Sequence, residues 1–265
     1  VLRADDGIFR LYYRAGRYGT PEYLDSAVDW VDTRKTFGCY LESFDGIHWA
    51  RPSAGQFEVA GTRENNVVLT EETGGSWPGD IAPFEDTREG VPPEERYKGI
   101  AGMSGKVFAY GSPDGVNWRL LHNAPVIEGY DAQAYAFWDA ERGEYRSYCR
   151  HRRIAAYQAG MDELGDAPLE TDDQGMTGDG LDNGRDIVTQ TSEDFIHWSK
   201  PEFLSYSPGR VSELYENVTR PYYRAPHMIM GFPLRYIDRG WTAALEALPQ
   251  LDHRRERIEM GESRY

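Results

Sequence analysis

Acidic side chains stand immediately before several runs of residues that the sequence predicts as strands. Asp80 precedes a short apolar run, Asp131 precedes an aromatic run, and Glu213 and Glu216 precede a third extended run. Hydrolysis of a glycosidic bond uses two carboxyl groups, one protonated as the acid and one ionised as base or nucleophile. These four carboxyl groups are therefore the candidate catalytic residues.

Each of these carboxyl groups also has a structural interpretation. Asp80 follows a Pro-Gly dipeptide, where an aspartate commonly caps a turn. Asp131 is placed like Asp80, at the start of the next repeat, and we expect it to be functional. Either Glu213 or Glu216 could be the general acid, and their spacing does not choose between them.

Neighbouring residues could bind a substrate beside these carboxyl groups. Trp77 lies three residues before Asp80, and Asn217 and Arg220 follow the glutamates closely enough to bind hydroxyl groups. Arg150 and His151 end an aromatic strand, where they either point into a site or form a solvated basic turn. A histidine at that place could also contact a central ion.

A frame of Ser, Asp two residues later and Trp six residues later occurs at 43–49, 112–118 and 192–198. Each frame follows a short strand, and Asp-Gly in the first two frames is a strong signal for a tight turn. The spacing of the frames is too long for a solenoid unit and suits a four-stranded propeller blade. We expect the serine and aspartate to bond the turn and the tryptophan to pack between blades, which is a structural role.

The elements that must position these residues are short strands, with turns between them. The expected strands are 8–14, 37–43, 80–84, 97–103, 106–111, 117–121, 132–138, 144–150, 186–191, 218–224 and 227–232. One helix is expected over 241–257. The acidic, glycine-rich stretch between Arg152 and Arg185 has the composition of a solvated loop, since its aspartates do not follow a calcium-loop spacing.

Composition narrows the class of protein. The 265 residues are 40% apolar, which is enough to form a large hydrophobic core. The net charge of −15 disfavours binding to nucleic acids, whose phosphates are also negative. No run of eighteen apolar residues is present that could span a bilayer. Cys39 and Cys149 fit no zinc spacing and are expected to be buried free thiols.

Motifs spread over residues 37–236 resemble the five-bladed β-propeller glycoside hydrolases, the superfamily of families 32, 43 and 68. The most similar branch is the bacterial group described as glycosyl hydrolase family 32 N-terminal-like, together with family 43-like proteins. The residues with this likeness are Glu42–Pro52, Glu64–Val67, Pro92–Lys98, Tyr130–Gln133, Ala136–Asp139, Gly143–Arg146, Asp194–Trp198 and Arg220–His227.

The resemblance implies an all-β fold, with residues 1–265 forming part of one five-bladed propeller that starts and ends within blades. It implies a glycosidase that acts on an oligo- or polysaccharide, with carboxyl groups at the axis and a further aspartate that orients the acid or the sugar. It implies no cofactor, leaving room for a structural calcium ion, and no nucleic-acid or membrane partner. A secreted or periplasmic location is expected rather than a cytoplasmic one.

Two other functions stay open at this point. A non-catalytic carbohydrate-binding propeller would need the same site without a working acid. A sugar phosphorylase would need cationic phosphate ligands, for which Arg150, Arg152 and Arg220 are the candidates.

Overall fold

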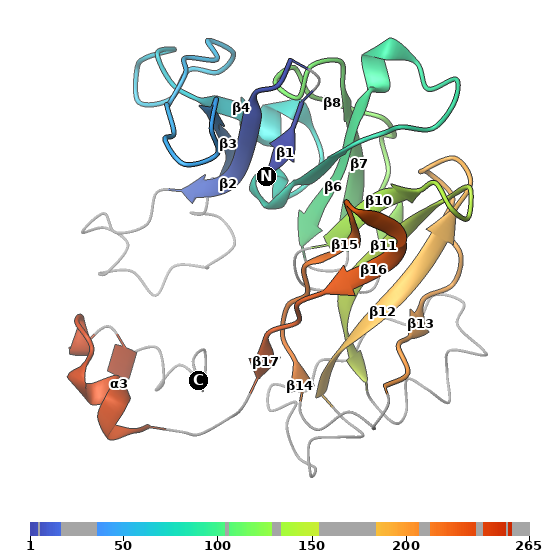
Figure 1. Ribbon diagram of the computed structural model, residues 1–265. Coiled ribbons are helices and arrows are strands. Elements are labelled where there is room, and N and C mark those ends of the chain that lie inside the picture. The colour runs from blue at the N-terminus through green and yellow to red at the C-terminus, as the bar shows by residue number, and fades with distance from the viewer. Residues whose placement is uncertain are drawn as a thin grey trace.

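The structure is a computed structural model that describes residues 1–4, 6–16, 36–103, 106–128, 134–153, 184–206, 213–236, 241–252 and 254–255. The described residues form an all-β protein with antiparallel sheets and a short helix (Figure 1). The expectation of an all-β fold is therefore confirmed. Asp131 and the acidic insertion from 154 to 183 lie outside the described residues.

The strands of the three larger sheets follow one another in chain order. Sheet 1 contains β1 (Leu2–Arg3), β2 (Phe9–Gly16), β3 (Thr36–Ser43) and β4 (Val67–Leu69). Sheet 2 contains β5 (Ala82–Glu85), β6 (Tyr97–Met103), β7 (Lys106–Ser112) and β8 (Arg119–Leu120), with β9 (Ile127–Glu128) also paired to β7. Sheet 3 contains β10 (Ala134–Asp139), β11 (Glu144–Arg153), β12 (Gly184–Ser192) and β13 (Glu202–Phe203).

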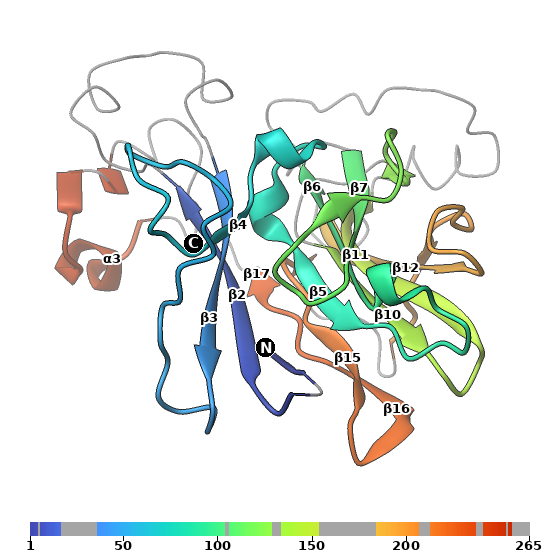
Figure 2. The ribbon, with the colours of Figure 1, turned by 90° about the horizontal axis from the view of Figure 1, so that it is seen from above.

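Two smaller pairs of strands follow. The hairpin β15 (Thr219–Tyr222) and β16 (Ala225–Gly231) forms one pair, and β14 (Glu213–Leu214) pairs with β17 (Arg235–Tyr236). Short 3-10 turns are η1 (Glu71–Thr73), η2 (Pro78–Asp80) and η3 (Pro93–Glu95). Figure 2 shows sheet 1 on one side of the molecule, sheets 2 and 3 on the other, and the β15–β16 hairpin beside them.

Most expected strands match observed strands to within a few residues, and 97–103 matches β6 at both ends. The strand expected over 80–84 begins later, because Asp80 ends the turn η2 and only Ala82 starts β5. The helix expected over 241–257 is also shorter. The helix α3 spans Ala243–Ala247, and Leu248 beyond it has an extended backbone directly before Pro249, which cannot continue a helix.

Two clusters of buried apolar residues fill the spaces between the larger sheets. One cluster joins sheets 1 and 2 through side chains such as Tyr40, Leu69 and Tyr110. The other joins sheets 2 and 3 through side chains such as Ile100 and Phe137. Cys39 and Cys149 are both buried, and neither forms a disulfide bond.

The three Ser-x-Asp-x-x-x-Trp frames form the same turn, which confirms the structural role expected for their serine and aspartate. In the second turn, Ser112 Oγ accepts from Gly115 N at 2.9 Å, and Asp114 Oδ1 accepts from Val116 N at 2.8 Å and Asn117 N at 2.7 Å. The turns 43–49 and 192–198 repeat these main-chain bonds. Each aspartate therefore bonds its own turn and is not available as a catalytic group.

A second repeated feature is an aspartate near the end of the first strand of each larger sheet, paired with a cation on the second strand. The pairs are Asp6–Arg10 at 2.8 Å, Asp86–Lys98 at 2.6 Å and Asp139–Arg146 at 3.1 Å. In sheets 2 and 3 the register is the same, because Lys98 and Arg146 lie opposite Phe84 and Phe137, each two residues before the aspartate. In sheet 1 Arg10 lies opposite Leu2, four residues before Asp6.

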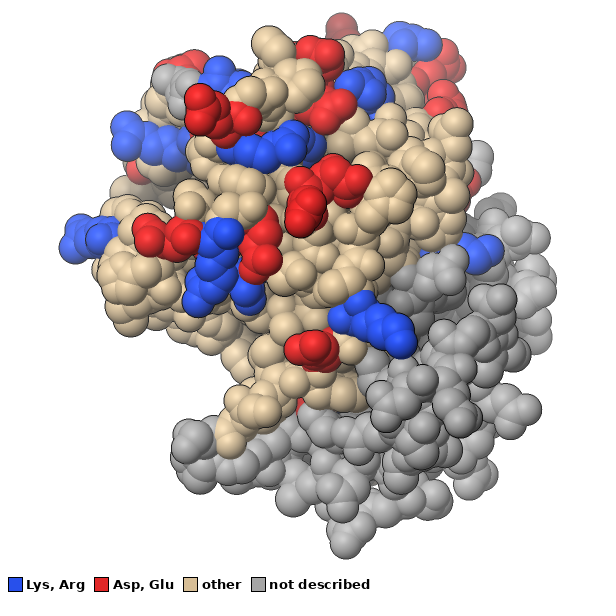
Figure 3. Space-filling model, turned by 90° about the vertical axis from the view of Figure 1, so that its right-hand side faces the viewer, with Lys and Arg blue, Asp and Glu red and all other residues tan. Residues whose placement is uncertain are grey.

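The surface mixes charges of both signs. On the face in Figure 3, acidic and basic side chains alternate over the described residues and do not gather into a basic patch. Across the part of the chain that the structure describes, no helix is both long enough and apolar enough to cross a membrane.

Candidate functional site

The candidate site lies where the first strands of sheets 2 and 3 and of the β15–β16 hairpin meet. β10 contacts both β5 and β15, and η2, which ends at Asp80, contacts the second strand of sheet 1. Residues at the starts of these strands are therefore brought together from distant parts of the chain. From the sequence alone, only the repeated strand pattern indicates that the starts of these strands lie close together.

Asp80 is fixed in this site by an arginine from sheet 1. Arg14 Nη1 donates to Oδ1 of Asp80 at 3.0 Å and to Oδ2 at 3.1 Å. The Asp80 side chain is only 11% exposed, whereas that of Arg14 is 40% exposed. One largely buried carboxylate is thus oriented by one partly exposed cation, 66 residues apart in the sequence.

Glu216 is the second carboxyl group of the site. Burial raises the pKa of Asp80, the Arg14 guanidinium opposes this, and the charge of Glu216 adds to the increase. Glu216 itself is half-buried, and among the described residues none hydrogen-bonds or ion-pairs with its carboxyl group. The site therefore combines one anchored carboxylate with one whose oxygens are available.

Tyr135 on β10 faces the same two carboxyl groups. Burial raises its pKa, the charges of Glu216 and Asp80 raise it further, and that of Arg220 lowers it. A phenol with a raised pKa stays protonated, so its O–H remains a hydrogen-bond donor at neutral pH.

Arg220 on β15 ties the converging strands together. Its Nη2 donates to the main-chain oxygen of Pro83 on β5 at 2.8 Å, and its Nη1 to that of Ala136 on β10 at 3.3 Å. Burial lowers the pKa of Arg220 to about 10, opposed by Tyr135, so it is charged at neutral pH. Its guanidinium lies 6.0 Å from the centre of the Tyr135 ring. Arg220 therefore joins the strands that carry the site, and its expected binding of hydroxyl groups stays a prediction.

Trp77 begins the turn that presents Asp80. Its backbone is left-handed, with φ of 49°, an unusual conformation for a bulky residue and one that commonly marks a functional segment. The indole is half-buried. The turn η2 is only three residues long, so Trp77 immediately precedes the segment that presents Asp80.

The segment that contains Glu216 is fixed on both sides. Arg150 is buried on β11, where it donates to the main-chain oxygen of Tyr215 at 3.2 Å and lies 4.3 Å from the centre of that ring. Asn217 is also buried and accepts a hydrogen bond from the Thr219 hydroxyl. Both residues that were expected to bind substrate thus contact the backbone or side chains next to Glu216.

His151 occupies a different environment. Its ring is 2% exposed and packs edge-on against Phe203 of β13 at 5.9 Å between ring centres, and its residue pairs with Asp186 in the β11–β12 register. The structure therefore places His151 in the core of sheet 3, on the side of the outermost strand.

Two predicted catalytic residues are not placed by the structure. Asp131 lies outside the described residues, and of Glu213 only the backbone is described, at the start of β14. Two other residues of the site, Arg14 and Tyr135, were missed by the sequence analysis. Their signal was weak, because an arginine ending a strand and a tyrosine inside one are both common.

Across the described parts of the chain, no group of three or more His, Cys, Asp or Glu side chains has the arrangement to hold a metal ion. The described side chains that converge at the site are two carboxyl groups, a phenol and an arginine. The chain was also compared with known proteins. No family model and no curated protein matches the sequence.

Proposed function

We propose that this protein is a glycoside hydrolase whose catalytic carboxyl groups are Asp80 and Glu216. The observation that supports the proposal most is the electrostatic coupling of two differently held carboxyl groups at one place. Asp80 is anchored by Arg14, as suits a group that stabilises positive charge, and no described residue hydrogen-bonds the carboxyl group of Glu216, which when protonated can donate to a leaving group. Acid–base hydrolysis of a glycosidic bond requires such a division of roles.

The fold belonging to this function is a five-bladed propeller, of which the described sheets form part. Three features support it. The sheets are meanders in chain order, their first strands β1, β5, β10 and β15 contact one another in that order, and the turn frame recurs in each larger sheet. In such an arrangement the first strands line the axis, and the carboxyl groups stand at its mouth.

A carbohydrate-binding function without catalysis is the second candidate. The ion pair of Arg14 with Asp80 favours it, because a carboxylate neutralised by an arginine is a weaker base than a free one. A sugar phosphorylase is less well supported, because Arg220 and Arg150 both donate to main-chain oxygens.

The experiment is a screen of the protein on aryl glycosides and on plant, algal and fructan polysaccharides, with analysis of the products. Two variants, Asp80→Asn and Glu216→Gln, should lose hydrolysis while their melting temperatures stay close to the parent value. The matched control, Asp45→Asn, changes an aspartate of a surface turn and should retain hydrolysis. Binding of a polysaccharide without any product would favour the non-catalytic candidate.

A further inference from the structure

Arg14 holds Asp80 with only part of its guanidinium group. Its Nη1 donates to both oxygens of Asp80, at 3.0 and 3.1 Å. Its Nε and Nη2 make no hydrogen bond or ion pair with any residue that the structure describes. The Arg14 side chain is 40% exposed whereas its partner is largely buried, so solvent reaches the pair from the arginine side.

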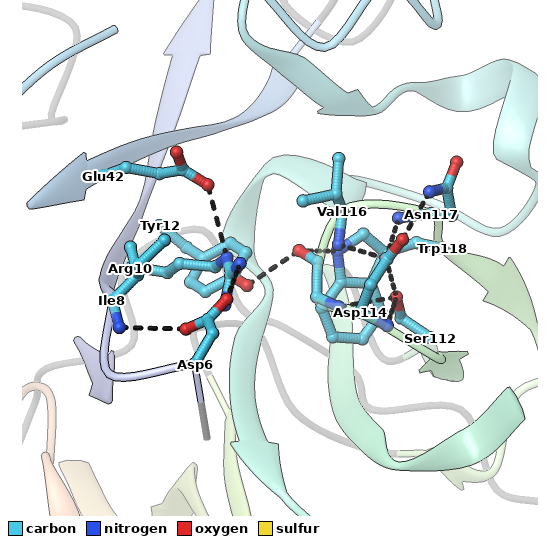
Figure 4. A network of polar contacts seen from close by, with 11 residues as sticks. Asp6, Ile8, Arg10, Tyr12, Glu42, Ser112, Asp114, Val116, Asn117 and Trp118 are labelled. Atoms are coloured by element: carbon cyan, nitrogen blue, oxygen red, sulfur yellow. Dashed lines mark hydrogen bonds and ion pairs between the residues drawn. The ribbon is translucent and has the colours of Figure 1, made fainter. Parts of the chain in front are cut away.

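Two other arginines on the second strands of the larger sheets contact two carboxylates each. Arg10, four residues before Arg14 on the same face of β2, pairs through Nη2 with Asp6 at 2.8 Å and through Nε with Glu42 at 3.5 Å (Figure 4). Arg146 of β11 likewise pairs with two carboxylates, one through Nε and one through Nη2. Arg14 has one carboxylate partner among the described residues, and the edge formed by its Nε and Nη2 has none.

The stem of Arg14 is held against the turn that presents Asp80. A Cβ added at Gly79 would lie 3.0 Å from Cγ of Arg14 and 3.0 Å from the main-chain oxygen of Phe37, so a larger residue would have to displace one of them. The turn and the arginine side chain are therefore in close contact. A guanidinium whose stem and one nitrogen are already fixed loses little further freedom when its other edge binds a ligand.

The charges around the two carboxyl groups leave room for an anion. Arg220 donates to main-chain oxygens of β5 and β10, and among the described residues it forms no ion pair. When Glu216 is protonated, as a general acid must be, the charged groups of the site are Asp80, Arg14 and Arg220, so cations outnumber anions by one. A partly buried cation without a counter-ion is costly, and a negatively charged group on a ligand would offset that cost.

We propose that the substrate of this site is a glycoside of a uronic acid, whose carboxylate binds the Nε–Nη2 edge of Arg14. The N–H groups of that edge are parallel and match the two oxygens of a carboxylate. The inference rests on the proposed hydrolase function, because it assigns the chemical class of the sugar bound at the same site. Asp80 and Glu216 keep their roles in hydrolysis.

The test uses sets of aryl glycosides that differ only at C6, which carries a carboxylate, a hydroxyl or a sulfate ester. The parent should hydrolyse the uronide with a kcat/KM about 10- to 100-fold higher than that for the neutral glycoside, the usual effect of hydrogen bonds to a charged group. Arg14→Lys keeps a cation for Asp80 but has no second edge, so the ratio should fall close to one. Arg14→Gln should lose activity on both glycosides and lose more on the uronide.

The matched control is Arg119→Gln. Arg119 is also an exposed arginine paired with one carboxylate, Glu95 at 3.2 Å, but it lies on β8 outside the site. This variant should keep the parent ratio of uronide to neutral glycoside. If melting curves show that Arg14→Gln does not fold, Arg14→Lys alone decides.

Three results would overturn the proposal while leaving hydrolysis intact. A ratio that the Arg14 variants leave unchanged would mean that Arg14 acts only on Asp80. A parent that prefers the neutral or the sulfated glycoside would exclude the uronate. Release of a glycosyl phosphate when inorganic phosphate is added would show that phosphate is the anion.

Failure of the proposed hydrolase function has a different signature, because the parent then cleaves no glycoside of any set. Calorimetry with a diuronide and the neutral disaccharide of the same linkage tests the anion site by itself in that case. Binding of the diuronide alone, weakened about tenfold or more by Arg14→Lys, would support the site. Equal binding of both sugars, binding of neither, or binding of the diuronide that Arg14→Lys leaves unchanged would overturn it.

Discussion

Aspartates occur in two contrasting settings in this molecule. In the surface turns, Asp114 and Asp194 have pKa values below the usual range, because hydrogen bonds from the turn outweigh the effect of burial. The pKa of Asp45 is also lowered, by hydrogen bonds from the side chain and main chain of His48 and from Ile47 N. All of these partners lie within three residues of the aspartate.

Asp80 shows the opposite behaviour. Burial raises its pKa, Arg14 opposes the increase, and Glu216 adds to it, so its determinants lie 66 and 136 residues away. This comparison indicates that an aspartate whose hydrogen bonds all come from its own turn has a structural role, even when it recurs in every repeat. A carboxyl group that depends on distant charges is the better candidate for chemistry.

The largest expected effect concerns turnover. Glu216→Gln and Asp80→Asn should each lower kcat on a substrate found in the screen by about 10²- to 10⁴-fold, the usual contribution of an acid–base group. Asp114→Asn should leave kcat within a few-fold of the parent value. Steady-state kinetics on the three variants measure this, and similar losses in all three would remove the distinction between the two settings.

The next effect concerns stability at a third kind of aspartate, one that is buried and paired. Lys98 and Asp86 have side chains that are 1% and 0% exposed, and Tyr145 also donates to Asp86. Lys98→Met leaves a buried carboxylate without its cation and should lower the free energy of unfolding by about 3–5 kcal/mol. Urea unfolding measures it, and a loss below about 1 kcal/mol would contradict the description of Asp86 as a buried carboxylate that depends on Lys98.

A smaller effect is expected on the free energy of unfolding when the aspartates of two surface turns are replaced. Asp114→Ala removes two main-chain hydrogen bonds in a turn that packs on sheet 1 and should lower the free energy of unfolding by about 1–2 kcal/mol. Asp45→Ala makes the same change in the exposed turn 43–49 and should cost less, because the end of that turn is more accessible to water. Glu193→Ala, at an exposed position of the third turn that is neither its serine, its aspartate nor its tryptophan, is the control in the same unfolding measurements.

The smallest expected effect is on the pH dependence of stability, because ionisation of Asp114 stabilises the fold whereas ionisation of Asp80 opposes folding. The lowered pKa of Asp114 means that its ionised form stabilises the fold above about pH 4, and this contribution is lost as the pH falls through the folded-state pKa. The raised pKa of Asp80 means that its ionisation opposes folding at neutral pH. Asp114→Asn should therefore lower the melting temperature at pH 7, and Asp80→Asn should not. The difference in melting temperature between each variant and the parent should become smaller towards pH 3. Thermal melts between pH 3 and 7 measure it, and a difference that stays constant over this range would contradict the account.

The sequence predicts the turns well because their determinants are local. Each Ser-x-Asp-x-x-x-Trp frame contains both the donors and the acceptors of its own turn. The sequence also predicts Asp80 and Glu216 as candidates, since both precede short strands of the repeat.

Long-range pairing is where the sequence is insufficient. The bond from Arg14 to Asp80 depends on how sheet 1 packs against η2, and the donation of Arg220 to Pro83 depends on β15 reaching β5. Nothing in the local sequence of Arg220 indicates that it donates to two main-chain oxygens 84 and 137 residues away. The aspartate–cation pairs of the three larger sheets were not predicted either, because charged residues near a strand end are common on solvated surfaces.

The central claim is that Glu216 donates a proton to the leaving group, and its most direct test varies that group. Hydrolysis by Glu216→Gln is compared with the parent on glycosides of one sugar that differ only in leaving-group acidity. For an alcohol or sugar leaving group, which needs protonation, kcat/KM should fall by about 10²- to 10⁴-fold. For dinitrophenol, which leaves without a proton, it should fall by less than about tenfold, since an acid catalyst contributes little there. An equal loss across the series, or no loss with the alcohol, would contradict the assignment of Glu216 as the acid.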